Sequence, residues 1–204
     1  MTNTERGFFE TWRERLTRLA GDAVGQHRIV RGIPVTVVNT RPDIDTDHVL
    51  RRLEAALDLI AQYQPWRFRR LQHDVAQILV RRYPCRAAYH PPSRTCLVEL
   101  TFLANPDFST AQLGASIVHE AIHARLDRMG VRVLPQQKAR EERLCRMAEV
   151  EFGLAVPNGQ PVVERARAAL DLSDEEVAPV IDWAEANRRV VSADREGAAR
   201  PGKG

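Results

Sequence analysis

The chain has 204 residues, of which 44% are hydrophobic and 28% are charged, and its formal net charge is +3 at pH 7. This length suffices for one domain with a sizeable core, and the composition excludes a disordered or fibrous protein. No run of 18 apolar residues is present, so we expect no transmembrane segment. Charged residues interrupt the first 15 positions, which argues against a secretory leader and predicts a cytoplasmic protein.

The basic residues are almost all arginine, and they are spread along the chain. Arginine pairs at 51–52, 69–70, 81–82 and 188–189 are separated by acidic and apolar residues. No basic segment is interleaved with aromatic residues, as it is in proteins that stack nucleic-acid bases. Nucleic acid is therefore not expected as a partner.

The N-terminal segment is predicted to be an amphipathic helix. Phe8, Phe9, Trp12, Leu16 and Leu19 recur at helical spacing within residues 4–24. We assign this helix to a separate unit, residues 1–30. It is expected to dock onto the domain or onto a partner protein, in preference to a membrane surface.

The next segment alternates between strand and helix signals. Residues 32–39 form a short segment with several β-branched side chains, which predicts a strand. After a turn at 41–45, Asp45 or Thr46 is the candidate N-cap of a helix, which apolar residues at helical spacing predict and which ends before Pro65. A second helix is predicted from there to Pro84, with an apolar side that includes Phe68, Leu71, Val75, Ile78 and Leu79.

A β-hairpin is predicted from residues 85–103. The two strands are residues 85–90 and 95–103, and the turn between them contains Pro91 and Pro92. Cys85 and Cys96 flank this turn, and in a reducing compartment we expect thiols rather than a disulfide. Tyr89 and His90 are conceivable transition-state stabilisers, although structural roles beside a turn are favoured.

Residues 109–129 form the segment around which the chain is organised. Ser109 and Gln112 make a capping box, and Gly130 follows as a helix-ending residue. Within this helix lies His119-Glu120-Ala121-Ile122-His123, an H-E-x-x-H motif. Residues at i and i+4 share one helix face, so the two imidazoles can hold one metal ion, for which Zn²⁺ is the best match. Glu120 lies beside that metal, where its carboxylate can accept a proton from water.

A third protein ligand is expected from the following helix, residues 136–152. Leu126 and Met129 exclude the metzincin pattern, which requires Gly and His at those positions. The following helix contains four glutamates, and the apolar Leu144, Met147, Ala148 and Phe152 are predicted to mark its buried side. Cys145 is interpreted as a packing residue. The candidate ligands are Glu142, Glu141 and Glu149.

The C-terminal region is predicted to contain two further helices. A turn at 157–159 precedes a short helix that ends near Leu172. Ser173 and Glu176 form a second capping box, which opens a helix that continues to about Val190. We assign residues 158–191 to helices packed on the domain and residues 192–204 to a disordered tail.

The pattern of the two central helices resembles the gluzincin class of zinc metallopeptidases, and more narrowly small bacterial proteins of the ImmA/IrrE type. The similarity rests on the H-E-x-x-H motif, on a Glu about twenty residues later and on Leu154-Ala-Val-Pro157. It implies His119, His123 and Glu142 as zinc ligands and Glu120 as general base. It also implies that a strand beside the motif helix borders the cleft, where an extended peptide can pair with its edge.

These observations together predict an α+β, mostly helical protein with a small sheet beside the motif helix. Residues 31–157 would form a zincin-like catalytic domain that hydrolyses a peptide bond of a protein or peptide substrate with a metal-activated water. The alternative is a non-catalytic zinc-containing module that binds a protein partner or regulates it. A DNA-binding module in which the motif is accidental is the weakest hypothesis.

Overall fold

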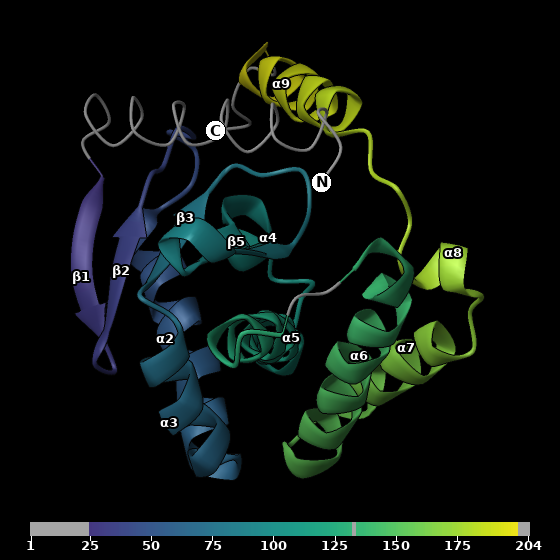
Figure 1. Ribbon diagram of the computed structural model, residues 1–204. Helices are drawn as coiled ribbons and strands as arrows, with labels where there is room; N and C mark the ends of the chain where they lie inside the picture. Colours follow the sequence, from purple (N-terminus) through teal and green to yellow (C-terminus); the bar gives the residue numbers. More distant parts are fainter. Residues whose placement is uncertain (1–24, 132–133, 200–204) are drawn as a thin grey trace.

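The computed structural model describes residues 25–131 and 134–199, which form a mostly helical α+β fold with one five-stranded sheet (Figure 1). This confirms the predicted fold class. The elements before the central helix are β1 (Gln26–Val30), β2 (Ile33–Val37), α2 (Thr46–Tyr63), α3 (Pro65–Asp74), β3 (Gln77–Arg81), β4 (Ala87–His90), the 3-10 turn Pro91–Ser93, β5 (Thr95–Glu99) and α4 (Leu100–Ala104). Then come α5 (Thr110–Arg128), a 3-10 turn at Pro135–Gln137, α6 (Lys138–Ala155), α7 (Gln160–Leu170), α8 (Asp174–Val177) and α9 (Trp183–Ala199).

The sheet has the strand order β1-β2-β3-β5-β4. The β1–β2 and β4–β5 pairs are antiparallel, whereas β3 is parallel to both β2 and β5. Arg31 and Gly32 join β1 to β2 with positive φ angles of 49° and 78°, the geometry that a tight hairpin turn requires. β4 is therefore an edge strand of this sheet, and like its neighbour β5 it contacts α5.

The two faces of the sheet pack against different elements. One face contributes Val35, Ile78 and Val98 to the main core, which is shared with α2 and α5. On the other face Leu79 and Leu97 pack with Tyr83 in a small cluster, against which Trp183 of α9 lies. Because alternate residues of a strand point to opposite faces, the central strand β3 is apolar on both sides.

Two strands occupy positions at which the sequence predicted helix. Residues 26–30, assigned to the N-terminal helical unit, form β1, and residues 77–81 form β3 rather than the end of a helix. Helix α3 stops at Asp74, and Val75 adopts an extended backbone. A short apolar run fits both helical and strand spacing, and here pairing with β2 and β5 decides for the strand. The predicted amphipathic helix of this unit, residues 4–24, lies outside the described residues.

Two other predicted elements end earlier than expected. The second hairpin strand stops at Glu99, whose side chain accepts a hydrogen bond from the N–H of Phe102 and so caps α4. The helix that opens at Ser173 is only one turn long, and a new helix, α9, begins at Trp183. Residues 192–199, predicted to be disordered, belong to α9, whose Asp194 pairs with Arg82 of the sheet layer.

The other predicted boundaries agree with the structure. Asp45 caps α2 through its side chain, Pro65 starts α3, and the capping boxes of Ser109 and Ser173 are both formed. The three cysteines are free thiols, as expected. Among the described helices, none combines the length and the apolar character that crossing a membrane requires.

Helices α5 and α6 approach each other closely at Gly114. A Cβ atom on this glycine would lie 2.8 Å from the ring of Phe152, a side chain of α6 that is completely buried. This contact fixes how α6 lies along α5, and α7 packs against the other side of α6 (Figure 1).

We expect Gly114→Ala to destabilise the protein less when Phe152 is shortened to Leu. In the unaltered chain the new methyl group clashes with the ring, at a cost of about 1–3 kcal/mol that the better helix propensity of Ala offsets in part. In a Phe152→Leu background the clash is relieved, so a double-mutant cycle measured by urea unfolding should show a stabilising coupling. Additive effects would contradict the close approach.

The small cluster on the second face also makes a chemical prediction. Burial raises the pKa of the Cys85 thiol to about 12, so at pH 8 it is almost entirely protonated. The thiolate is the reactive form, and alkylation of Cys85 at pH 8 should be on the order of 100-fold slower than in the unfolded chain. The rate should rise about tenfold per pH unit between pH 8 and 10, and Trp183→Ala should speed it up. Mass spectrometry of the Cys85 peptide measures it, and equal rates in folded and unfolded protein would refute the prediction.

Candidate metal centre

The H-E-x-x-H motif lies in the most deeply buried helix of the described fold. Helix α5 runs through the middle of the molecule, between α2 and α3 on one side and α6 on the other (Figure 1). His119 and Glu120 each expose only 7% of their surface, and His123 is partly exposed. Polar side chains in such positions need partners, because unpaired burial costs about 1–3 kcal/mol or more.

Glu142 of α6 faces the Nε2 atoms of both histidines. Its Oε2 lies 3.2 Å from Nε2 of His119, and its Oε1 lies 3.7 Å from Nε2 of His123. In a tetrahedral zinc site, bond lengths of about 2.0–2.1 Å place a nitrogen and an oxygen ligand about 3.4 Å apart. The two measured separations lie on either side of this value, so the donor set fits Zn²⁺.

The Nδ1 atoms of the histidines have different partners. Nδ1 of His119 lies 2.7 Å from Oε1 of Glu149, and Nδ1 of His123 lies 2.7 Å from Oε1 of Glu141. Metal-binding histidines commonly donate their second N–H to a carboxylate, which fixes the tautomer and the orientation of the ring. Of the three glutamates that the sequence offered as the third ligand, Glu142 is the one beside the Nε2 atoms. Glu141 and Glu149 instead contact the Nδ1 atoms and orient the rings.

Glu149 is in turn held by two arginines. It exposes only 1% of its surface, and it accepts hydrogen bonds from Arg146 at 2.6 Å and from Arg165 at 2.8 Å. Arg146 is on α6 itself, whereas Arg165 is on α7. Sequence analysis missed these two residues, since neither has a motif spacing that marks it.

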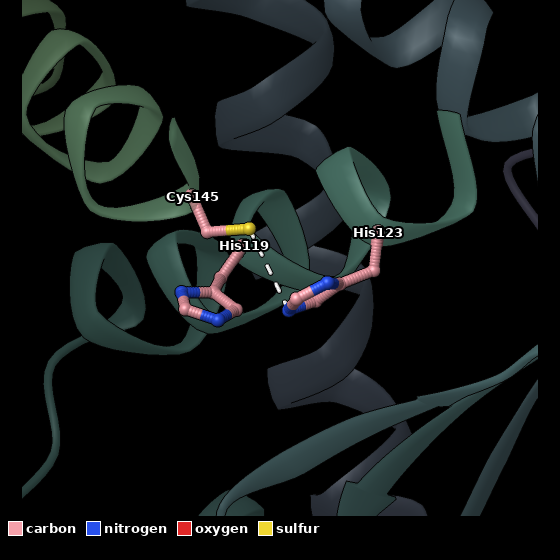
Figure 2. Close-up of side chains that lie close together, drawn as sticks. All are labelled: His119, His123 and Cys145. Carbon is pink, nitrogen blue, oxygen red and sulfur yellow. Dashed lines mark hydrogen bonds between the residues drawn. The ribbon is translucent and has the colours of Figure 1, made fainter. Parts of the chain in front are cut away.

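Cys145 is the third residue that the structure brings to the two histidines. Figure 2 shows its side chain reaching from α6 toward the rings, and its Sγ lies 3.5 Å from Nε2 of His123. Donor atoms of His119, His123 and Cys145 all lie within 4.8 Å of one another. Cys145 was interpreted as a packing residue, and its spacing of three residues from Glu142 is the sequence signal that could have placed it here.

Opposite charges dominate the electrostatics of the centre. Burial lowers the pKa of His119, but the Glu142 and Glu149 carboxylates outweigh this and raise it to about 9. Burial lowers the pKa of His123 as well, and hydrogen bonding to Glu141 reverses that shift. Carboxylates thus surround both imidazoles and create a negative potential that attracts a cation.

Glu120 differs from the other acidic residues of the centre. Burial raises the pKa of its carboxyl group above the usual range, although the nearby His119 and His123 and a backbone hydrogen bond with Tyr89 oppose the shift. Groups with perturbed pKa values in partly enclosed sites are candidates for proton transfer.

Tyr89 connects Glu120 to the edge strand β4. The N–H of Glu99 donates to the carbonyl of Arg86, and in an antiparallel pair every second residue then faces the neighbouring strand. The backbone groups of Ala87 and Tyr89 consequently point away from β5, toward the motif helix. The Tyr89 hydroxyl donates to Asp127 at 2.9 Å, which agrees with the structural role favoured for its side chain.

The apolar side chains Leu144 and Met147 do not lie where the sequence predicted. They are 42% and 50% exposed, so the prediction that they mark the buried side of α6 is wrong. Ala148 and Phe152 are buried as predicted, and the polar residues Cys145 and Glu149 share their side of the helix, where histidines and arginines satisfy them. Leu144 and Met147 line a groove of about 290 Å³ between α3, α5 and α6, and none of the candidate ligands borders it.

Comparison with known proteins assigns the chain to no family and to no function. No protein-family model, curated protein or solved structure matches the chain. The functional argument therefore rests on the residues of the centre.

We expect Glu149→Gln to weaken zinc binding about 10–100-fold, the usual effect of removing a carboxylate behind a metal-binding histidine. The amide keeps the shape of the side chain but leaves Arg146, Arg165 and the Nδ1 of His119 without a charged partner. Competition against a chromophoric chelator measures the affinity. Glu164→Gln, an exposed change on α7, is the matched control and should bind as the unaltered chain does. Equal zinc affinities for the two variants would show that Glu149 does not support the metal site.

Proposed function

We propose that the chain is a zinc-dependent metallopeptidase that hydrolyses a peptide bond with Glu120 as general base. The observation that carries the proposal is the convergence of His119, His123 and Glu142, with 3.2 Å and 3.7 Å between the carboxylate and the two Nε2 atoms. Two imidazoles and one carboxylate are a frequent ligand set of catalytic zinc.

Each residue of the centre has a defined task in this proposal. His119, His123 and Glu142 would hold the ion, and Glu141 and Glu149 would orient the rings. When bound, Zn²⁺ would supply Lewis acidity to a water molecule and to the scissile carbonyl. Glu120 would accept the proton of the water and pass it to the leaving amine, and its raised pKa suits a group that must both take and return a proton.

The edge strand β4 supports a protein or peptide as the substrate. The outward-facing backbone of Tyr89 hydrogen-bonds to Glu120, and an extended peptide can add to an edge of this kind by main-chain hydrogen bonds. Placed there, a peptide bond would run past the end of the Glu120 side chain. The cytoplasmic location predicted from the sequence belongs to the same proposal.

The decisive experiment is Glu120→Gln in a screen against a mixed peptide library read by mass spectrometry. We expect the zinc-loaded protein to cleave a subset of peptides. The Gln variant should keep its zinc and lose about 10²–10⁴-fold in rate, because only the proton acceptor is removed. His119→Ala should lose both zinc and cleavage. Cleavage by Glu120→Gln at the unaltered rate would disprove the assignment of Glu120. Absence of cleavage by the zinc-loaded protein, both as the unaltered chain and as Cys145→Ala, would disprove the peptidase.

A non-catalytic zinc-containing module is the second candidate function, and one observation favours it. Cys145 adds a fourth donor near the histidines, and zinc sites with four protein ligands are usually structural. In that case the chain would act by binding or regulating a protein partner. Elemental analysis would then find zinc that is retained through dialysis against chelator, without cleavage of any peptide.

A further inference from the structure

We infer that Cys145 is a fourth ligand of the metal and that the centre rests in a closed state. This inference rests on the proposed zinc site and concerns its regulation. Whether Cys145 is bound to the metal would determine whether the metal has an open position for water.

The position of the sulfur atom fits a ligand. With bond lengths of about 2.3 Å to sulfur and about 2.0–2.1 Å to nitrogen, the two donors of a tetrahedral zinc site lie about 3.6 Å apart. The Sγ of Cys145 lies 3.5 Å from Nε2 of His123. Figure 2 shows the side chain of Cys145 directed toward the two rings, with a dashed line from its sulfur to His123.

The surroundings of Cys145 hold it in this position. The residue has no exposed surface, and it lies on the buried side of α6, three residues after Glu142 and four before Glu149. Residues at these spacings share one helix face, so the packing that sets Glu142 beside the histidines also sets Cys145 there. Phe152, on the same side of the helix, anchors that face against Gly114 of α5.

The chemistry of the four donors favours zinc in a neutral site. One thiolate and one carboxylate balance the two positive charges of the ion, and the two imidazoles are neutral. A thiolate also selects Zn²⁺ over the harder Mg²⁺ and Ca²⁺ ions. The set of two His, one Glu and one Cys therefore makes a complete tetrahedral shell from side chains alone.

A complete shell has a direct consequence for Glu120. A zinc ion with four protein ligands has no open position, so no water is held beside the general base. The centre would open when the Cys145 side chain withdraws, which leaves the ligand set of His119, His123 and Glu142.

X-ray absorption of the zinc-loaded, full-length protein tests the ligation directly. We expect one sulfur neighbour at about 2.3 Å in the unaltered chain, absent in Cys145→Ala and present in the matched control Cys85→Ala. Cys85 is outside the centre, and its Sγ contacts the carbonyl of Ala87. A zinc spectrum of the unaltered chain without sulfur overturns the inference, and this measurement does not depend on the folding of any variant.

Binding of acetohydroxamate to the cobalt-substituted protein tests whether the centre is closed. This small chelating ligand needs an open position, so it should perturb the visible cobalt spectrum at concentrations at least about tenfold lower in Cys145→Ala and Cys145→Ser than in the unaltered chain. Equal binding in all three would overturn the closed state.

These outcomes are separable from those of the proposed function. Sulfur at the zinc and weak hydroxamate binding, together with no peptide cleavage even by Cys145→Ala, would retain the inference and reject the peptidase. Peptide cleavage by a zinc centre without a sulfur ligand would retain the peptidase and reject Cys145 as a ligand.

Discussion

The close contact between Gly114 of α5 and Phe152 of α6 is the constraint on which the centre depends. A helix pair can rotate and slide, and each residue of slippage on α6 would turn a different side chain toward the histidines. The glycine lets the aromatic ring sit directly on the backbone of α5, which fixes both the rotation and the height of α6. Glu142, Cys145 and Glu149 then face α5 together, and the apolar Leu144 and Met147 face outward.

Such an arrangement buries an unusual amount of negative charge. Taking an ion out of water costs several kcal/mol unless it is paired, so a side of α6 that contains two glutamates would not pack on its own. His119, Arg146 and Arg165 surround the carboxylate of Glu149 and offset this cost. Arg165 comes from α7, which makes the helix after the turn at 157–159 a part of the centre rather than an appendage to it.

The same packing supplies both an open and a closed version of the metal site. Two imidazoles and Glu142 alone would leave a position for water beside Glu120, the geometry of a hydrolase. Adding Cys145 fills that position, the geometry of a structural site. Both candidate functions thus follow from one set of side chains. They differ in whether Cys145, whose sulfur lies 3.5 Å from Nε2 of His123, can withdraw from the metal.

Local signals in the sequence determined a large part of the fold. The capping boxes of α5 and α8, the cap of α2, the break at Pro65 and the hairpin around Pro91 and Pro92 were all predicted, because each depends on residues only a few positions apart. The H-E-x-x-H motif is another such local signal, since a spacing of four residues on one helix brings His119 and His123 together.

Only the tertiary structure decided which residues meet these histidines. The sequence favoured Glu142 through the family resemblance and left Glu141 and Glu149 as rivals, and the packing of α6 on α5 gave each a separate partner atom. Strand β3 and the positions of Leu144 and Met147 on α6 were mispredicted for the same reason. Pairing with β2 and β5 overrode the helical spacing of 75–79. His119 and Arg165, distant in the sequence, joined Arg146 of the same helix and allowed the polar Glu149 to be buried. Contacts between distant segments set the energies of these elements, and no local pattern encodes them.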